Sequence, residues 1–154
     1  MSKNVWGPAT WHLLHCIVLK IDDNIDSQQL EDLKAVIFRI VNNLPCPYCT
    51  DHATSFLKTN KFSSISTINA LRYFMFYFHN KVNERLKKPQ IDYEQHLQIY
   101  VNMNLKIVVD HFFTVYREMS QTSVTMMLRS FHRTMLLNEL NKYFIRSQNL
   151  YRLY

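Results

Sequence analysis

Residues 30–49 read LEDLKAVIFRIVNNLPCPYC, and this stretch decides the fold class. From Leu30 to Leu44 the apolar residues recur at three- and four-residue steps, which is the period of an amphipathic helix. Pro45 ends that pattern, and the pair Cys46 and Cys49 follows at once. The sequence therefore places a C-x-x-C pair directly after a helix and not after a buried strand.

The C-x-x-C pair points to thiol redox chemistry. Cys46 can cap a helix whose first residue is Pro47, and we expect that helix to run over 47–57. A helix start favours the thiolate form of a cysteine, and a thiolate is the species that attacks disulfides. Cys-Pro-Tyr-Cys is also the glutaredoxin tetrapeptide, but a glutaredoxin-like carrier needs a βαβ pattern around it. A third interpretation is a helical interaction module clipped by zinc, with His52 and Cys16 completing the ligands.

Helical periodicity covers most of the remaining chain. We expect helices over 8–21, 26–44, 68–88 and 123–146, and one that begins after Asp92 and whose apolar pattern continues to Phe112. Capping-box signals precede two of them, at Asp26 and at Asp92, and residues 121–123 read as a break before the last one. The only glycine is Gly7, so tight hairpins lack their usual turn residue. The predicted class is all-α.

Composition narrows the function. The chain has 154 residues, enough for one domain with an extension. Its 18 basic and 12 acidic residues give a net charge of +6. These residues are dispersed, which argues against a nucleic-acid stripe. No apolar run approaches the roughly 20 residues of a membrane span, and residues 1–4 lack an apolar signal core, so we expect a cytoplasmic protein. Three cysteines without a signal peptide fit a catalytic pair better than a disulfide framework.

Three separated blocks then identify a family. They are WGPATWHLLH at residues 6–15, LPCPYC at 44–49 and HNKVNERLKKP at 79–89. Their order and spacing resemble the Erv/ALR family of FAD-linked sulfhydryl oxidases. The continuation to His52 and Ala53 is most similar to the compact oxidases of large cytoplasmic DNA viruses, which implies host cytoplasm and the virion as locations.

The resemblance implies a four-helix bundle with a short fifth helix that binds FAD over residues 1–104, usually as a homodimer. It leaves residues 105–154 as a helical extension for packing or dimerisation. It assigns catalysis to two cysteines, with Cys49 against the flavin and Cys46 exchanging with the substrate. It implies no metal and the following cofactor-binding residues: Trp11, His15, Cys49, His79, Asn80, Val82, Asn83, Lys88 and Tyr100.

The resemblance also implies a reaction. A protein dithiol would reduce the Cys46–Cys49 disulfide, electrons would pass to FAD, and dioxygen would become hydrogen peroxide. Cys16 lies inside an apolar helix and reads as an inert buried thiol, so no second pair can shuttle electrons. We therefore expect a thioredoxin-like or C-x-x-C-bearing carrier as the donor. Phe76 and Tyr93 stand where many relatives have a disulfide, and an aromatic contact would replace that bond.

Overall fold

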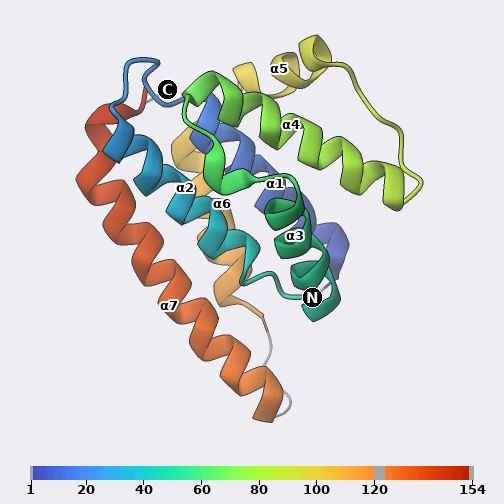
Figure 1. Ribbon diagram of the computed structural model, residues 1–154. Helices are drawn as coiled ribbons and strands as arrows, with labels where there is room; N and C mark the ends of the chain where they lie inside the picture. Colours follow the sequence, from blue (N-terminus) through green and yellow to red (C-terminus); the bar gives the residue numbers. More distant parts are fainter. Residues whose placement is uncertain (1, 120–123, 153–154) are drawn as a thin grey trace.

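The computed structural model describes residues 2–119 and 124–152, and the regular structure there is helical (Figure 1). The helices are α1 (Lys3–Leu19), α2 (Ser27–Val41), α3 (Pro47–Thr59), α4 (Ile68–Arg85), α5 (Tyr93–Val101), α6 (Leu105–Arg117) and α7 (Val124–Ser147), with 3-10 turns η1 (Phe62–Ser64) and η2 (Gln148–Leu150). Within these described ranges the one β-type pairing is an isolated bridge between Ile21 and Tyr151. The all-α prediction is confirmed, and no βαβ unit surrounds the cysteine pair.

Helix α1 lies at the centre of the molecule. It packs against α2, α4, α5 and α6, while α7 runs along the outer side of α2 (Figure 1). One hydrophobic core joins these helices and includes Leu13, Ile37, Leu71, Phe112 and Leu140. The segment after residue 104 thus contributes to the same core as the bundle, and the predicted boundary falls in the turn between α5 and α6.

The predicted helix starts are largely confirmed, because side-chain caps fix them. Asp26 and Asp92 each form a complete capping box, with Gln29 and Gln95 as the reciprocal partners. Cys46 caps α3, and Pro47 is its first residue. The predicted break and start signal at residues 121–123 lies outside the described residues.

The first helix begins earlier than predicted. Pro8 suggested a start at residue 8, but α1 starts at Lys3 and holds Pro8 inside it. Pro8 is the sixth residue of α1, so it removes one intrahelical hydrogen bond from the second turn. Trp6 and Ala9, on either side of Pro8, are buried and stabilise this part of the helix. The earlier start also places Lys3 in α1, beside the site described below.

Two helix ends also differ from the prediction. Helices α2 and α4 end three residues early, at Val41 and Arg85, and Lys87 takes a left-handed φ of 57° that closes α4. The apolar pattern after Asp92 left the end of the fifth helix open. In the structure α5 is short and ends at Val101, and residues 102–104 separate it from α6. Asn104 starts α6, since its side-chain oxygen accepts a hydrogen bond from the Ile107 N–H at 3.1 Å.

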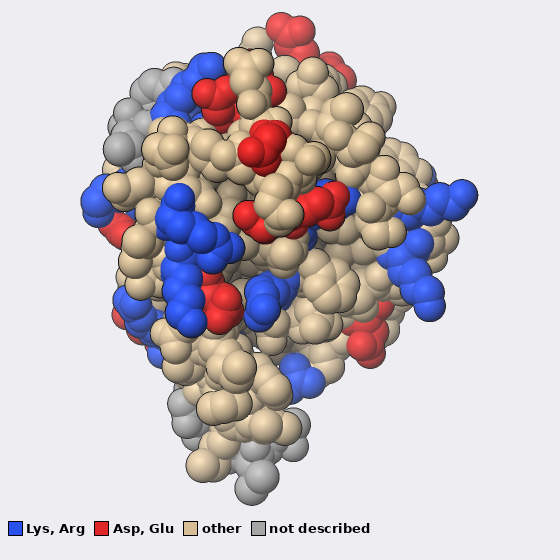
Figure 2. Space-filling view, turned by 60° about the vertical axis from the view of Figure 1, so that its left-hand side comes forward, with Lys and Arg blue, Asp and Glu red and all other residues tan. Residues whose placement is uncertain are grey.

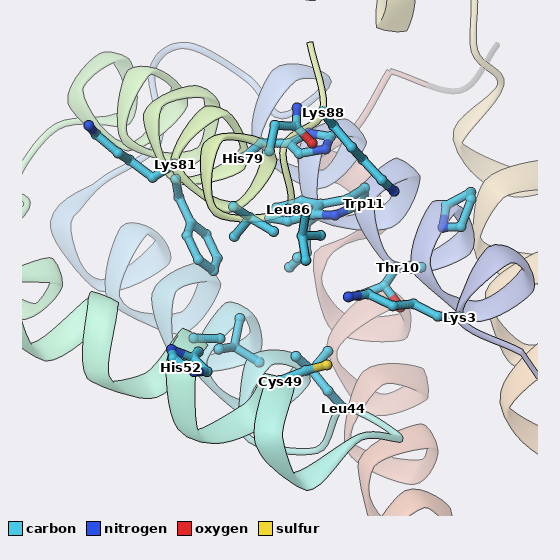
Figure 3. A pocket seen from close by; sticks show the side chains of 18 of the residues that line it. Lys3, Thr10, Trp11, Leu44, Cys49, His52, His79, Lys81, Leu86 and Lys88 are labelled. Carbon is cyan, nitrogen blue, oxygen red and sulfur yellow. The ribbon is translucent and has the colours of Figure 1, made fainter. Parts of the chain in front are cut away.

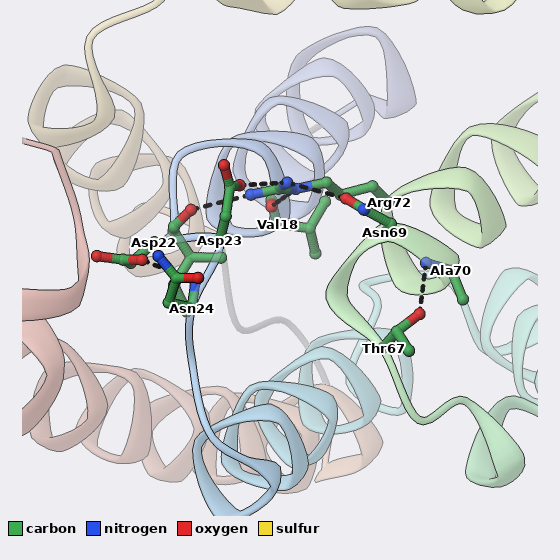
Figure 4. Close-up of polar contacts among 9 residues, drawn as sticks. Val18, Asp22, Asp23, Asn24, Thr67, Asn69, Ala70 and Arg72 are labelled. Carbon is green, nitrogen blue, oxygen red and sulfur yellow. Dashed lines mark hydrogen bonds and ion pairs between the residues drawn. The ribbon is translucent and has the colours of Figure 1, made fainter.

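Arg72 ties α4 to the loop that joins α1 and α2 (Figure 4). Its guanidinium donates to the carbonyl oxygens of Val18 and Ile21 at 2.8 and 2.9 Å and pairs with Asp23 at 2.6 Å. The side chain is 12% exposed, so these contacts are largely shielded from water. Arg72 therefore fixes the position of α4, which carries one wall of the site.

Polar contacts attach the extension to the bundle. The Tyr116 hydroxyl of α6 lies 2.7 Å from the Thr10 hydroxyl of α1, and both side chains are buried. After η2, the N–H of Arg152 donates to the Lys20 carbonyl at 3.3 Å and the N–H of Asp22 to the Leu150 carbonyl at 2.8 Å. Both ends of the extension are thus fixed against α1 or the loop that follows it.

The predicted aromatic contact between Phe76 and Tyr93 is confirmed. Their ring centroids lie 5.1 Å apart in an edge-on arrangement, and His96 contacts both rings. This cluster joins α4 to α5 without a covalent bond. None of the described helices is long and apolar enough to cross a bilayer.

Candidate active site

The cysteine pair lies at the start of α3, where the backbone sets its geometry. The Cys46 sulfur accepts a hydrogen bond from the Cys49 N–H at 3.2 Å, so the first sulfur occupies the helix cap. Both cysteines are half-buried, and they are not bonded to one another in this structure. The arrangement places unpaired N–H groups and the positive end of the helix dipole beside Cys46.

The two thiols have unlike acidities. Burial raises the pKa of Cys46, but hydrogen bonds from the Cys49 thiol and from the backbone of Cys49 and Tyr48 outweigh it, so the pKa lies below the ordinary value. Burial, together with the hydrogen bond and charge of Cys46, raises the pKa of Cys49. Lys3 favours the thiolate of both residues. In the reduced pair, Cys46 is therefore the more acidic thiol, and the Cys49 thiol donates a hydrogen bond to its sulfur.

A cavity of about 430 Å³ opens beside the pair, and Cys49 lines it (Figure 3). Helix α3 contributes Cys49 on one side, and α1 and α4 contribute Trp11 and His79 on the other (Figure 3). The rings of Trp11 and His79 stack with centroids 3.9 Å apart and planes 9° from parallel. Phe56 and Phe78, which stack at 4.9 Å, widen this aromatic wall.

The rim of this cavity is basic. Lys3, Lys81, Arg85 and Lys88 line it, and no aspartate or glutamate does so among the described residues. Figure 3 shows Lys3, Lys81 and Lys88 around the opening. The cavity size is that of an ordinary ligand pocket. Flat aromatic walls with a cationic rim suit a planar aromatic ligand that carries phosphates.

Most of the predicted cofactor residues line this cavity. Those that do are Trp11, Cys49, His79, Val82, Asn83, Lys88 and Tyr100. His15 and Asn80 do not. The His15 ring is fully buried and lies 2.9 Å from His79 through Nε2 and Nδ1, so it supports a lining residue from behind. The Asn80 amide donates to the Ile91 carbonyl at 2.8 Å and accepts from the Ile91 N–H at 3.2 Å, which clamps the loop after α4. Cys46 does not line the cavity either.

Three neutral histidines form a layer that begins with His79 in the aromatic wall and continues behind it with His15 and His96. Burial, and then the neighbouring histidines, lowers the pKa of His15 well below its ordinary value. Burial lowers the pKa of His79 and of His96 to about 4 in each case, and His96 and Lys88 add to the effect on His79. The Nδ1 atom of His15 and the Nε2 atom of His96 are buried without hydrogen-bond partners among the described residues. This layer is therefore uncharged at neutral pH.

Sequence analysis did not single out several lining residues. Phe56 and Phe78 belong to apolar helix faces, and such a stripe looks the same whether it meets a core or a ligand. Lys3 lay outside the predicted first helix, and no role was assigned to Arg85. The available signal for Arg85 was its position inside the third motif block.

The zinc interpretation finds no support in the described part of the chain. No group of three or more histidine, cysteine, aspartate or glutamate side chains there could hold a metal ion. Cys16 is fully buried inside α1 and does not line the cavity beside Cys49. Burial raises the pKa of the Cys16 thiol to about 11, which fits the predicted inert role.

Comparison with known proteins agrees with the motif pattern. The profile of the Erv1 / Alr family matches residues 8–102. The chain belongs to the Erv1 / Alr family. The matched region starts inside α1 and ends just after α5, so it contains both cysteines and leaves out Lys3, α6 and α7. The predicted resemblance is confirmed.

Curated relatives carry one function name. An FAD-linked sulfhydryl oxidase of African swine fever virus (isolate Pig/Kenya/KEN-50/1950) is 31% identical over 103 residues, which cover 67% of this chain and 86% of the relative. The protein of that name from the isolate Tick/Malawi/Lil 20-1/1983 is 32% identical over 95 residues, covering 62% and 79%. FAD-linked sulfhydryl oxidase ERV1 of Oryza sativa subsp. japonica is 34% identical over 89 residues, covering 58% and 45%.

Proposed function

We propose that this protein is an FAD-dependent thiol oxidase that forms disulfide bonds in protein substrates and passes the electrons to dioxygen. The observation that carries the proposal is the placement of one cysteine of the pair, Cys49, in the wall of an aromatic cavity with a basic rim. Membership of the family and the shared name of the relatives support a thiol oxidase with FAD as its cofactor.

The residues of the cavity fit FAD. Trp11, His79 and Tyr100 offer flat surfaces to the isoalloxazine and adenine rings, and the basic rim offers hydrogen-bond donors to the diphosphate. Val82 and Asn83 line the same wall, and we assign them to the cofactor as well. We assign His15 and Asn80 to positioning, because the first supports His79 and the second clamps the loop that follows α4.

The cysteines divide the exchange between them. A substrate thiolate attacks the Cys46 sulfur of the oxidised pair, the Cys46–Cys49 bond breaks, and Cys49 leaves with the electron pair. The second substrate thiolate then attacks the mixed disulfide and releases Cys46, whose negative charge the Cys49 N–H stabilises at 3.2 Å. The substrate leaves as a disulfide, and two electrons and two protons remain with the pair. When bound beside Cys49, FAD would supply the acceptor for the two electrons and the route to dioxygen, which would become hydrogen peroxide.

We also propose a thiol donor, an oligomeric state and a cellular location. Cys16 is buried, so electrons enter from another protein, and we propose a thioredoxin-like or C-x-x-C-bearing carrier. We further propose a homodimer, as the family resemblance implies. We propose the host cytoplasm and the virion as its location, because several relatives are viral. Nucleic acid is not proposed as a partner, since basic and acidic side chains alternate over the face in Figure 2.

The test is a comparison of three cysteine variants. Purified protein should be yellow and should consume oxygen and produce hydrogen peroxide when given dithiothreitol. Cys49→Ser should abolish flavin reduction because the sulfur in the cavity wall is lost. Cys46→Ser should block oxidation of the dithiol and leave flavin bound. Cys16→Ala is the matched control, and it should retain flavin reduction. A folded, colourless protein that does not take up added FAD would refute the proposal.

A further inference from the structure

A second cavity, of about 270 Å³, lies on the other side of the cysteine pair. Leu44, Pro47 and Thr50 from the C-x-x-C region form one wall, and Leu128, Arg129 and Arg133 from α7 form the other. Leu44 lines this cavity and the aromatic one, so the cysteine turn separates the two. The family match ends before α7, and this wall therefore belongs to the extension.

Arg133 is the unusual residue of this second cavity. It is only 5% exposed, and its Nη2 atom is buried with no hydrogen-bond partner among the described residues. Arg129 and His132 line the cavity beside it, and Asp51 is the one carboxylate among the described lining residues. A buried guanidinium nitrogen without a partner is costly, and the cost is offset when an anion binds it. The cavity therefore favours the binding of an anionic group.

Exposed apolar side chains adjoin the cavity on α7. Leu128 lines the cavity and is 58% exposed, and Phe131 and Met135 follow it at helical spacing with 59% and 47% exposed. In Figure 2, which turns the side carrying α7 toward the viewer, the end of the molecule next to residues 120–123 is mostly uncharged. A protein surface fits this combination better than a small ion does, because an ion would leave the apolar side chains uncovered.

We propose that the second cavity docks the thiol-donating protein, with an aspartate or glutamate of the donor paired with Arg133 and its apolar surface on Leu128 and Phe131. The proposal rests on the proposed oxidase function, since docking here would bring donor cysteines to the Cys46 side of the pair. It names the substrate class as an acidic protein dithiol. It also gives α7 a role in substrate choice.

A binding measurement tests the docking site without relying on catalysis. Two labelled peptides would share one Ser-x-x-Ser sequence in place of Cys-x-x-Cys, one flanked by glutamates and the other by glutamines. We expect FAD-loaded protein to bind the acidic peptide about tenfold or more tightly than the neutral one, the scale of one charge-assisted hydrogen bond. Arg133→Gln should reduce that ratio to about one, and added salt should reduce it in the unaltered protein.

Two further variants keep the test decisive. Arg129→Glu changes a less buried residue, and it should weaken acidic-peptide binding even if Arg133→Gln proves unfolded by circular dichroism. Arg146→Gln is the matched control, because it removes one guanidinium from the same helix about 25 Å from Arg129. It should leave the ratio unchanged. Equal binding of the two peptides, or equal effects of Arg129→Glu and Arg146→Gln, would overturn the docking site.

Kinetics separates this inference from the proposed function. With the cysteine-containing peptides, the oxidase should show a higher kcat/KM for the acidic one, and Arg133→Gln should reduce that preference. A protein that oxidises dithiothreitol but does not distinguish the peptides would refute docking and leave the oxidase proposal in place. One that binds the acidic peptide preferentially but oxidises no dithiol would refute the oxidase proposal alone.

Discussion

The neutral histidine layer predicts a steep loss of stability in mild acid, and His96 offers the sharpest test. Its side chain is 1% exposed, its Nε2 atom has no partner among the described residues, and burial lowers its pKa from 6.5 to about 4. Because the unfolded chain binds a proton near pH 6.5 and the folded chain does not, acid favours unfolding. Stability is full above pH 6.5 and declines as the pH falls toward 4.

The size of the effect follows from the two pKa values. For a group that shifts from 6.5 to about 4, the free energy of unfolding falls by about 2 kcal/mol between pH 7 and pH 5. We expect His96→Phe to abolish that share of the loss. Phenylalanine can pack among Phe76, Tyr93 and Tyr100 and leaves no buried nitrogen unpaired, so stability at pH 7 should change by less than about 1 kcal/mol.

Urea unfolding of flavin-free protein at pH 7 and pH 5 measures both values. Carboxylates remain mostly ionised over this range, so histidines dominate the difference. His111→Gln is the control, because His111 is exposed on α6 and its replacement should leave the acid loss unchanged. If His96→Phe lost as much stability between the two pH values as the unaltered protein, the assignment of a neutral buried His96 would be wrong.

Three other substitutions test the contacts that hold the site in place. Arg72→Gln should lower the unfolding free energy by about 2–3 kcal/mol, because the Val18 carbonyl of α1 and the Ile21 carbonyl of the following loop lose a charged donor; a loss below about 0.5 kcal/mol in urea unfolding would contradict this role. Tyr116→Phe should cost about 1 kcal/mol by leaving the buried Thr10 hydroxyl with one partner fewer, and an unchanged melting temperature would count against it. Lys34→Met removes a buried ammonium, which favours stability, but it leaves the carbonyls of Ser63 and Ile65 unpaired, which opposes it. The unfolding free energy should therefore change little or fall by up to about 3 kcal/mol, and a clear rise would contradict this.

Local capping chemistry made the helix starts predictable. Asp26, Cys46 and Asp92 each accept a hydrogen bond from the residue three positions later, and such pairs are visible in the sequence. The break between α5 and α6 was not visible. The apolar steps from Val101 through Leu105 to Val108 stay in phase across it, so the pattern continues although the backbone turns. Nothing in the local spacing marks Asn104 as a cap.

The motif blocks predicted which elements build the candidate site, but not which of their side chains line the cavity and which are buried behind it. His15 and His79 looked alike in the sequence, yet His79 lines the cavity and His15 lies behind it. That difference depends on how α1 and α4 pack, which is a tertiary property. Arg133 of α7 shows the same limit. Its burial, and the cavity that it lines together with residues of the segment 42–51, depend on contacts between segments far apart in the chain.

The helical position of each residue in α3 explains why this helix can serve two cavities. Cys49, His52, Ala53 and Phe56 recur at steps of three and one and share the face that lines the aromatic cavity. Pro47, Thr50 and Asp51 repeat that spacing on the nearly opposite side of the helix and line the second cavity. Cys46 caps the start of this helix and lines neither cavity. Under the proposed function, one short helix would hold Cys49 against the cofactor and leave Cys46 at its start for the donor, without a second cysteine pair.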